Sequence, residues 1–467
     1  MGIFFSRSAG LQAPESLRKA GLQVLLPSDD EYAARQDSYW SNSAKLQPSY
    51  IVRPRNAQEV STAVTTLAAA GERFAVRSGG HTQWAGANSI EDGATLDLGL
   101  LTWTHFDATT ETVDIGSGGR WRDVYPALER HGRLVAGGRE GNVGVAGLVL
   151  GGGNTFFTPR YGFACDNVVA FEVALKGRSN NFGIVTNFRM KALKSSHVWG
   201  GLTFFPKQAT PSAALALTKF TDDMHKDVDS ILLCFFAYTG GTPQFQDVGI
   251  VAMYVQTAGV EKAPAYEQWL KLPSIMSTCQ MTTVSELVSA PQNNLPTHYH
   301  AIWFTATFKN DVRIVTKATE MHEDMVEEFK AAIPDGDFWT QCLFQPLPTL
   351  FGQRSAEAGG NAMSVEHQVH NGLLFQAAAM VRTPEQETFA YPRIMAWIQA
   401  VKEFAATIED GNLDWTYLNY ADRSQDPLVS YGVENVKKLK DVAAKYDPGQ
   451  VFQKLCPGGF KISQVKM

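Results

Sequence analysis

The sequence predicts an α+β protein of two domains, one of which contains an antiparallel sheet covered by helices. At 467 residues the chain is too long for a single ordinary core. Between residues 195 and 412 it carries long apolar strands such as "SILLCFFAY" and "GLLFQAAAMV", and we expect helices near residues 212–225, 315–332 and 391–409. Some neighbouring strands have no helix between them, which favours antiparallel pairing with the helices on one face.

Residues 50–190 have a different pattern, in which strands, glycine turns and short helices alternate. The stretch "RPRNAQEVSTAVTTLAAAG" predicts a helix, because Asn56 can cap it, Glu59 completes a capping box and Gly71 ends it. Its apolar face carries Val60, Val64 and Leu67. The stretch "RWRDVYPALERHG" predicts a second helix that ends at Gly132. A third helix is expected near the end of the chain, and its apolar face carries Val433, Val436 and Leu439.

Composition and charge exclude several classes of partner. The net charge is −6 and Lys and Arg form no dense run, so we expect no nucleic-acid partner. No segment approaches the roughly eighteen apolar residues of a membrane span. The first residues lack a secretory hydrophobic run, so we expect a cytoplasmic protein that binds small molecules. We expect no metal site, because no CxxC occurs and no third ligand is apparent beside His298, His300, His367 and His370.

Three glycine stretches lie within 75 residues of one another: "SGGH" at 78–81, "GSGG" at 116–119 and "VGVAGLVLGGG" at 143–153. Glycines allow backbone N–H groups to approach phosphate oxygens without Cβ atoms in the way. None of the three fits the dinucleotide pattern G-x-G-x-x-G or the P-loop pattern G-x-x-x-x-G-K-[ST]. The stretches therefore predict a dinucleotide that is held by another geometry.

Several ordered motifs carry a family resemblance: "VRSGGH", "GGRWRDVYPAL", "VGVAGLVLGGG", "SNNFGIVT", "YLNY" and "KYDPGQVF". Together they resemble the vanillyl-alcohol oxidase and para-cresol methylhydroxylase (PCMH) flavoprotein family, and within it the berberine-bridge-enzyme-like branch of fungal type. The resemblance implies a two-lobed FAD-binding domain of PCMH type that is formed by both chain ends, from residues 45–194 and a C-terminal segment at 413–462. Residues 195–412 would then form a substrate-binding domain.

The resemblance also implies which residues hold the cofactor. The histidine of the RSGGH motif is joined covalently to the 8α-methyl carbon of FAD in that family, and here it is His81. Further FAD contacts are implied for Arg77, Ser78, Gly79, Gly80, Thr82, Gly144, Gly147, Gly152, Gly153, Ile184, Val185 and Asn419. Tyr420 and Tyr161 are expected as neighbours of the flavin ring. Some members add a second link through a cysteine, but this chain has Arg139 and Glu140 near that place, so we expect the histidyl link alone.

By the same resemblance, the protein is expected to be an FAD-linked oxidoreductase. It would transfer a hydride from a small organic secondary metabolite to FAD, and O2 would reoxidise the cofactor. Such a reaction needs a group that takes a proton from the substrate. Tyr417, Glu366 and His370 are the candidates.

One departure from the family pattern leaves alternatives open. The chain is shorter than that pattern by about twenty residues between Leu175 and Lys176, which removes a strand and part of a loop near the cofactor. A lost strand exposes the backbone groups of its neighbours. The alternatives are a non-catalytic remnant that cannot hold FAD, and a flavin-dependent cyclase whose net reaction is not an oxidation.

Overall fold

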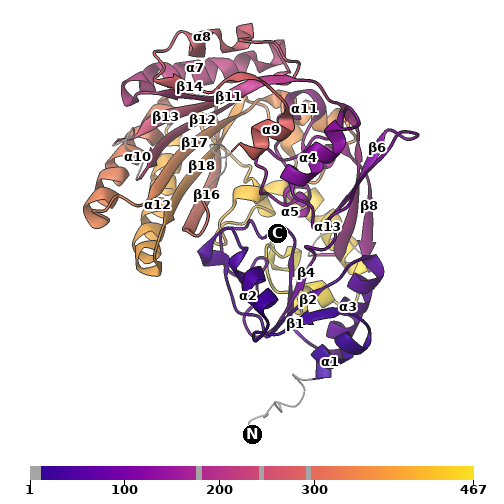
Figure 1. The fold of residues 1–467 in the computed structure, drawn as a ribbon. Coiled ribbons are helices and arrows are strands. Elements are labelled where there is room, and N and C mark those ends of the chain that lie inside the picture. Colours follow the sequence, from indigo (N-terminus) through magenta and orange to yellow (C-terminus); the bar gives the residue numbers. More distant parts are fainter. Residues whose placement is uncertain (1–11, 175–180, 241–246, 291–295, 467) are drawn as a thin grey trace.

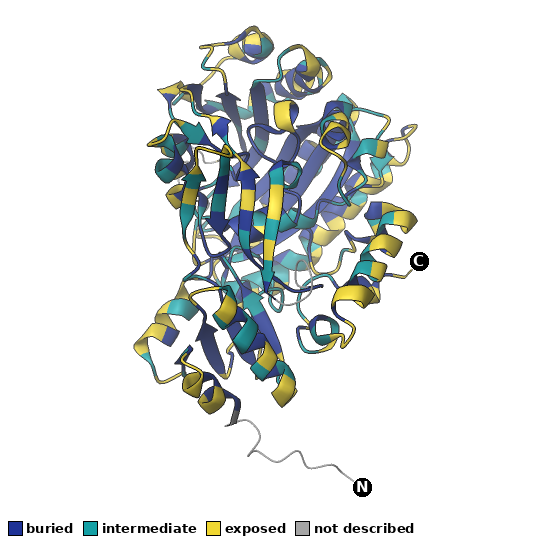
Figure 2. Cartoon of the chain, turned by 90° about the vertical axis from the view of Figure 1, so that its right-hand side faces the viewer, coloured by how far each residue is buried: buried dark blue, intermediate teal, exposed yellow. Residues whose placement is uncertain are grey.

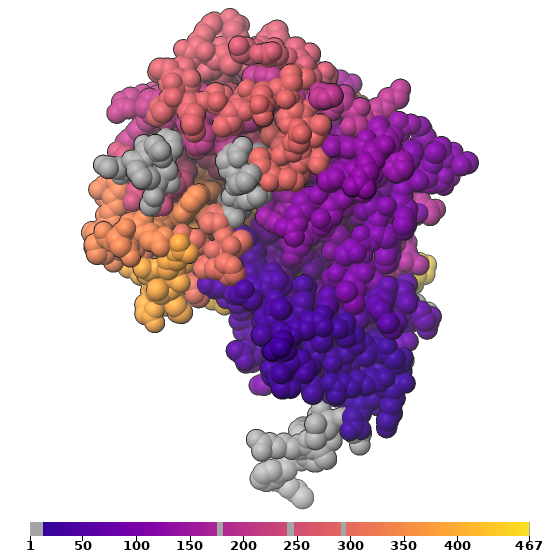
Figure 3. Space-filling view, viewed as in Figure 1, coloured from indigo at the N-terminus to yellow at the C-terminus, as the bar shows by residue number. Residues whose placement is uncertain are grey.

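The computed structural model describes residues 12–174, 181–240, 247–290 and 296–466, which form two lobes (Figure 1). One lobe combines two four-stranded sheets from the N-terminal part of the chain, and the other is built on a nine-stranded sheet. In the space-filling view, the indigo and purple N-terminal part lies below and beside the pink-to-orange lobe (Figure 3). The deletion expected at Leu175 and Lys176 lies outside the described residues.

The first four-stranded sheet has the order β1-β2-β4-β3, and its inner strands are parallel. Its strands are β1 (Gln23–Leu25), β2 (Tyr50–Arg53), β3 (Phe74–Arg77) and β4 (Ala94–Asp97), and its helices are α1 (Gln12–Lys19), α2 (Asp30–Asp37) and α3 (Ala57–Ala70). Helix α3 confirms the predicted caps, because Asn56 accepts a hydrogen bond from the Glu59 N–H and Gly71 is left-handed with φ of 63°. The second half of the predicted capping box is not formed, because the Glu59 carboxylate accepts a hydrogen bond from the Arg55 N–H and not from the Asn56 N–H.

The second four-stranded sheet has the order β5-β6-β9-β8 and is antiparallel throughout. Its strands are β5 (Thr104–Asp107), β6 (Thr112–Gly116), β8 (Val168–Ala174) and β9 (Ile184–Lys191). Helices α4 (Trp121–Glu129), α5 (Val145–Leu150) and α6 (Thr158–Tyr161) belong to the same region, and β7 (Arg133–Leu134) pairs with β10 (Leu193–Lys194). Helix α4 ends at Glu129, before the predicted stop at Gly132, which makes a separate left-handed turn.

The nine-stranded sheet is antiparallel and has the order β14-β11-β13-β12-β17-β18-β16-β19, with β15 paired to β11. Its strands are β11 (Val198–Phe205), β12 (Ser230–Thr239), β13 (Gly249–Gln256), β14 (Met276–Ser277), β15 (Gln280–Thr282), β16 (His300–Lys309), β17 (Trp339–Leu347), β18 (Gly372–Val381) and β19 (Asn412–Leu413). Its helices are α7 (Thr210–Asp223), α8 (Glu267–Leu270), α9 (Val284–Ser289), α10 (Val312–Ala332), α11 (Thr349–Glu357) and α12 (Pro384–Ala405).

Helices α7, α10 and α12 pack on one face of this sheet, and its long central strands are buried between these helices and the rest of the molecule (Figures 1 and 2). Successive side chains of β16 point to opposite faces of the sheet. Ile302, Phe304 and Phe308 belong to the core under the helices, whereas Ala301 and Trp303 pack with Trp40 from the N-terminal lobe. The antiparallel sheet with helices on one face confirms the predicted α+β fold class.

The C-terminal segment returns to the N-terminal lobe and lies between the two lobes (Figure 1). It contains the 3-10 helix η9 (Leu418–Tyr420) and the helices α13 (Gly432–Tyr446) and α14 (Val451–Lys454). Phe452 is buried in the core of the first sheet, and the Leu455 carbonyl accepts a hydrogen bond from the Phe74 N–H. Val436 is buried as expected, but Val433 is 68% exposed because α13 covers the core along a narrower stripe than its apolar pattern predicts.

Candidate active site

The first and third glycine stretches meet backbone to backbone. A Cβ atom on Gly79 would lie 2.6 Å from the Gly144 Cα, which is closer than any real Cβ contact. The Arg120 guanidinium joins the two stretches, because it donates to the Gly79 carbonyl at 2.6 Å and to the Asn142 carbonyl. These two glycines are therefore needed for the contact between the loops. Gly80 follows in the left-handed region with φ of 68°, which favours glycine there.

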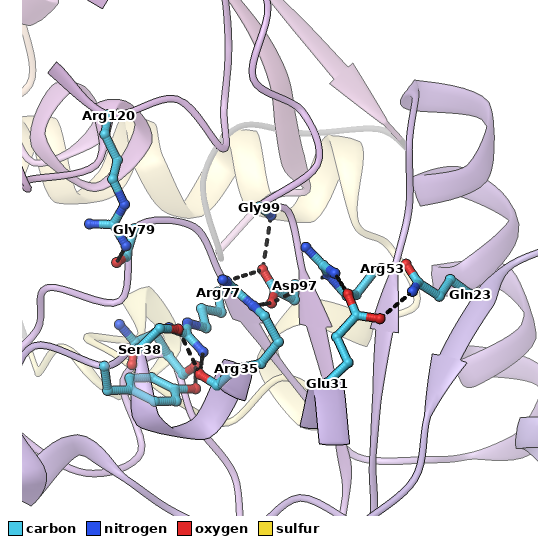
Figure 4. A network of polar contacts seen from close by, with 12 residues as sticks. Gln23, Glu31, Arg35, Ser38, Arg53, Arg77, Gly79, Asp97, Gly99 and Arg120 are labelled. Atoms are coloured by element: carbon cyan, nitrogen blue, oxygen red, sulfur yellow. Dashed lines mark hydrogen bonds and ion pairs between the residues drawn. The ribbon is translucent and has the colours of Figure 1, made fainter. Parts of the chain in front are cut away.

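Arg77 lies beneath the first glycine stretch and is fully buried (Figure 4). Its guanidinium donates to the Arg35 carbonyl and to Ser38 Oγ, and it lies 3.7 Å from the centre of the Tyr39 ring. Burial lowers the pKa of Arg77, although Tyr39 and Asp97 nearby oppose the shift. The Arg77 side chain thus supports the loop from below. Any contact from this position to a ligand would come from the backbone.

The remaining residues that were predicted to contact FAD differ in their solvent exposure and in the space around them. Gly147 on α5 is exposed, and a Cβ atom there would meet nothing within 4 Å. Gly152 and Gly153 have positive φ and are backed by Met363 and Ala164, respectively. Ser78 Oγ donates to the Ser117 carbonyl, Thr82 is half-buried, and Ile184 and Val185 are buried in β9.

Asn419 connects η9 to α5. Its Nδ2 donates to the Gly147 carbonyl at 3.2 Å and to the Leu148 carbonyl at 3.1 Å. Its Oδ1 is buried and has no hydrogen-bond partner among the described residues. A buried amide oxygen without a partner is costly, so Asn419 has an acceptor available beside Gly151, at the end of α5.

His81 is held between the lobes by aromatic and acidic side chains. Its imidazole stacks on the Trp40 indole, with ring centres 4.6 Å apart and planes 7° apart, and Trp303 on β16 is 6.4 Å away. Its Nε2 lies 3.4 Å from Glu140 Oε2. Both atoms are buried, and neither forms a hydrogen bond of good geometry within the described part of the chain. The backbone N–H of Trp40 donates to the Gly80 carbonyl, which holds the Trp40 backbone beside the glycine stretch.

The other Glu140 oxygen has two partners. It accepts hydrogen bonds from the Asn142 N–H at 3.1 Å and from Asn142 Nδ2 at 3.0 Å. Burial alone would raise the pKa of Glu140, but the interactions with His81 and Asn142 outweigh it and lower the pKa overall. Glu140 is therefore ionised at neutral pH and faces the imidazole as a negative charge.

Tyr420 forms a polar cluster with Arg139 and Gln345. The Tyr420 oxygen accepts from Arg139 Nη2 at 3.1 Å and from Gln345 Nε2 at 3.0 Å, and Arg139 also donates to Gln345 Oε1 at 2.6 Å. The Tyr420 ring contacts Trp303 edge to face with centres 6.0 Å apart. Trp303 therefore contacts both the His81 and Tyr420 rings, and together they form one site.

The three predicted proton acceptors lie in different surroundings. Tyr417 is buried, and its oxygen accepts from the Asn154 N–H at 2.7 Å; burial raises its pKa. His370 pairs with Asp410 at 3.0 Å, near the end of β18 where Gly372 faces Lys309. Lys309 is six residues along β16 from Trp303, so this end of the strand is about 20 Å from the cluster.

The other tyrosine and carboxylate candidates can also be placed. Glu366 lies in the 3-10 helix η8 (Val365–His367), and its Oε2 is buried without a hydrogen-bond partner among the described residues. Tyr161 is 42% exposed at the end of α6. The structure brings Tyr420, but not His370, into the His81 cluster. Trp40, Trp303 and Gln345 are additional members that sequence motifs did not indicate.

The sheet face beside this cluster is polar but carries few charges. Residues directly opposite one another on paired strands share a face, and three such rows cross β16, β18 and β17. The rows are Trp303–Ala378–Gln341, Thr305–Gln376–Leu343 and Thr307–Leu374–Gln345. The Gln376 Nε2 is buried and has no hydrogen-bond partner within the described segments. This face therefore offers amide and hydroxyl groups together with the Trp303 ring.

Comparisons with known proteins identify the class to which this fold and site belong. Residues 48–178 match the FAD binding domain family. The chain is 36% identical over 480 residues to the FAD-dependent monooxygenase drtC of Aspergillus calidoustus, which covers 97% of this chain and 91% of that protein. It is 34% identical to the FAD-dependent monooxygenase sdcF of Emericella nidulans, over 95% of this chain and 96% of that one.

Among solved structures, 6-hydroxy-D-nicotine oxidase from Arthrobacter nicotinovorans superposes with a TM-score of 0.75 at 21% identity, covering 94% of this chain and 97% of that one. The chain belongs to the FAD-linked oxidoreductases that include these fungal enzymes. Its fold is also that of Physcomitrella patens BBE-like 1, with a TM-score of 0.69 at 15% identity, covering 94% of this chain and 97% of that one. Its cofactor is FAD, and its relatives include fungal FAD-dependent monooxygenases.

The residues of the site fit this cofactor. Gly147 leaves open space beside α5, and buried polar atoms of Ser117 and Asn419 lack hydrogen-bond partners among the residues that are described. A flavin ring and its phosphates supply the polar atoms that such groups need. In the same described residues, no helix has the length and hydrophobicity to cross a membrane, and no cluster of three or more His, Cys, Asp or Glu could hold a metal ion.

Proposed function

We propose that the protein is an oxidase with histidyl-linked FAD, which removes a hydride from a small, oxygen-bearing aromatic metabolite. The observation that supports this proposal is the shared site of His81 and Tyr420, which combines a point of cofactor attachment with a proton acceptor. Bound FAD supplies the hydride acceptor and passes the electrons on to O2. The described side chains bind, orient and move protons around it.

His81 is suited to attachment because its ring is fixed in plane and direction. The stacked Trp40 sets the ring plane, and Glu140 faces Nε2. A neutral imidazole carries its proton on one nitrogen and a free lone pair on the other. With Nε2 facing a carboxylate, the proton belongs on Nε2 and the lone pair on Nδ1, so we assign Nδ1 as the atom that bonds the 8α carbon of FAD.

Tyr420 is suited to take the proton of a substrate hydroxyl. Its oxygen accepts two N–H donors, from Arg139 and Gln345, and such donors stabilise negative charge on a phenolic oxygen. Tyr417 lacks this arrangement, because its oxygen is bonded to the Asn154 N–H. Among the tyrosines of the "YLNY" motif, Tyr420 therefore has the better geometry for proton transfer.

The substrate class follows from the groups around Tyr420. Arg139 is a permanent cation, so it disfavours an ammonium group and favours a phenol, ketone or carboxylate. Gln341 and Gln376 add neutral hydrogen-bonding groups, and Trp303 offers an aromatic face. These features support a planar oxygenated substrate such as an aromatic secondary metabolite. The FAD-dependent monooxygenases among the relatives come from fungi, which is consistent with this class.

Those relatives also support a second candidate, in which one oxygen atom of O2 enters the product. The two candidates differ in measurable products. An oxidase releases one H2O2 for each product molecule and adds no oxygen from O2, whereas a monooxygenase incorporates ¹⁸O from ¹⁸O2.

The first experiment needs no substrate. Purified protein is precipitated with acid, and the pellet is examined for yellow colour and flavin fluorescence. We expect a coloured wild-type pellet and a colourless His81→Ala pellet, with the flavin of the variant in the supernatant. Release of all flavin from the wild-type protein would contradict the histidyl link. A panel of phenols, aromatic alcohols and amines is then screened for flavin reduction without oxygen, and reduction by amines alone would contradict the substrate class.

A further inference from the structure

We propose that Glu140 is a positioning residue for cofactor attachment, which fixes the proton of His81 on Nε2 and accepts that proton as the His81–FAD bond forms. This inference rests on the histidyl link of the proposed function. It adds a separate claim, namely that the Glu140 carboxylate takes part in forming that link. It concerns assembly of the holoenzyme and not oxidation of the substrate.

The geometry makes the two groups partners. Glu140 Oε2 is 3.4 Å from His81 Nε2, and both side chains are largely buried at 15% and 13% exposure. Neither atom has a hydrogen-bond partner elsewhere in the described residues, so each can satisfy the other only by sharing a proton. A shift of a few tenths of an ångström would bring the pair within ordinary hydrogen-bond distance.

The surroundings keep Glu140 in place and charged. The second carboxylate oxygen is held by two hydrogen bonds from Asn142, so the side chain cannot turn away from His81 without losing them. Asn142 is in turn fixed through its carbonyl, which accepts from Arg120. The lowered pKa of Glu140 keeps this carboxylate ionised at neutral pH, so Oε2 has an unoccupied acceptor position that faces His81.

The stacked Trp40 supplies the other constraint. It fixes the ring plane within 7° of its own, so the imidazole cannot rotate to exchange its two nitrogens without breaking this contact. Trp40 and Glu140 together leave Nδ1 as the nitrogen with a free lone pair. A ring held in this way meets the orientation requirement for bond formation.

The attachment step balances as follows. A bond forms between Nδ1 and the 8α carbon, and one C–H bond of that methyl group breaks. The methyl group loses a proton, the imidazole loses its Nε2 proton to Glu140, and two electrons pass through the flavin to O2. With the two protons, O2 becomes H2O2. Without an acceptor at Nε2, the attached imidazole would keep a positive charge in a buried site, which is unfavourable.

The test is the rate of covalent attachment. Wild-type protein and Glu140→Gln are produced under riboflavin limitation and incubated with FAD in air, and intact mass is followed over time. Non-covalent affinity is measured in parallel by flavin fluorescence at short times. We expect Glu140→Gln to bind FAD with unchanged affinity and to attach it about 100-fold more slowly, as is typical for loss of a general base.

A matched control is available in the same chain. His300 Nδ1 and Glu387 Oε2 form another histidine–glutamate pair, at 2.7 Å. His300 directly precedes Ala301 on β16, so the side chains of His300 and Ala301 point to opposite faces of the sheet. Ala301 is on the face that packs with Trp40, and the control pair is therefore on the other face. Glu387→Gln should leave the attachment rate at the wild-type value. If Glu387→Gln slows attachment as much as Glu140→Gln does, the effect is general and the proposal is wrong.

The outcomes separate this inference from the proposed function. Wild-type protein that binds FAD but never gains its mass contradicts the histidyl link itself and removes the basis for the role of Glu140. Wild-type attachment with an equally fast Glu140→Gln variant overturns the role of Glu140 alone. Should Glu140→Gln fail to bind FAD, Glu140→Asp decides, because it keeps the charge but withdraws the carboxylate by one methylene. Attachment by Glu140→Asp at the wild-type rate would then overturn the proposal.

Discussion

Two glycines of the cofactor domain should respond in opposite ways to the same small substitution. Gly147 on α5 has no atom within 4 Å of a built Cβ, whereas Gly79 meets the Gly144 Cα at 2.6 Å. We predict that Gly147→Ala stabilises the protein without FAD and weakens FAD binding. We predict that Gly79→Ala destabilises the protein whether or not FAD is present.

The magnitudes follow from these distances. Replacing a helical glycine by alanine in open space adds about 0.5–1 kcal/mol to the free energy of unfolding. If FAD covers Gly147, the added methyl group overpacks that contact at a cost of about 1–3 kcal/mol, which weakens binding by about 5- to 150-fold. At Gly79, a contact about 1 Å too short between two fixed backbones lowers the free energy of unfolding by about 1–3 kcal/mol or more.

The assay uses a His81→Ala background, so that FAD binds reversibly. Urea unfolding of the FAD-free protein gives the free energy of unfolding, and flavin fluorescence titration gives the dissociation constant of FAD. The reasoning is refuted if Gly147→Ala leaves the dissociation constant unchanged, because Gly147 would then not face the cofactor. It is also refuted at Gly79 if the alanine variant unfolds at the wild-type urea concentration.

Three further predictions concern other parts of the chain. Tyr420→Phe should slow flavin reduction by the identified substrate about 10²- to 10⁴-fold in anaerobic stopped flow, and unchanged reduction would exclude Tyr420 as proton acceptor. The same variant leaves the buried Gln345 amide without its partner, which should lower the free energy of unfolding in urea by about 1–3 kcal/mol. Arg77→Lys should lower the free energy of unfolding by about 1.5–3 kcal/mol, because lysine cannot reproduce the forked donors that bond Arg35 and Ser38 at the end of α2. A change below 0.5 kcal/mol, roughly that of a surface substitution, would contradict this role. Burial lowers the pKa of His322 to about 3, so below pH 6.5 the unfolded chain binds a proton that the native state does not bind. His322→Gln should therefore reduce the fall in the free energy of unfolding between pH 6.5 and 4 by up to about 1.4 kcal/mol per pH unit. Parallel pH curves of the free energy of unfolding for wild type and variant would contradict this.

Local sequence signals predicted the elements of the fold well, because short-range contacts determine them. Asn56 and Gly71 bound α3 as expected, and the long apolar strands form the antiparallel sheet. The end of α4 was misplaced by three residues, since Gly132 takes part in a separate turn and not in the helix cap. The exposure of Val433 on α13 was also not predicted, because an apolar residue at helical spacing does not show how wide a stripe of the helix the core covers.

The site was predicted less completely, because its contacts join distant parts of the chain. The family resemblance indicated His81, but its neighbours Trp40, Glu140 and Trp303 come from three separate segments and no spacing rule connects them. Tyr417 and Tyr420 belong to one motif, and only the tertiary contacts show that the Tyr417 oxygen accepts a hydrogen bond from the Asn154 N–H. Signals for Gln345 were absent, because a glutamine on a strand is ordinary in sequence.

The central claim is that His81 carries FAD, and peptide mapping tests it most directly. The FAD-saturated holoenzyme is digested, and the peptide that spans His81 is fragmented by tandem mass spectrometry. The proposed site predicts that this peptide carries the mass of the flavin and that the fragment ions assign it to His81. An unmodified His81 peptide from folded, FAD-saturated protein, or a flavin attached to another residue, would contradict it.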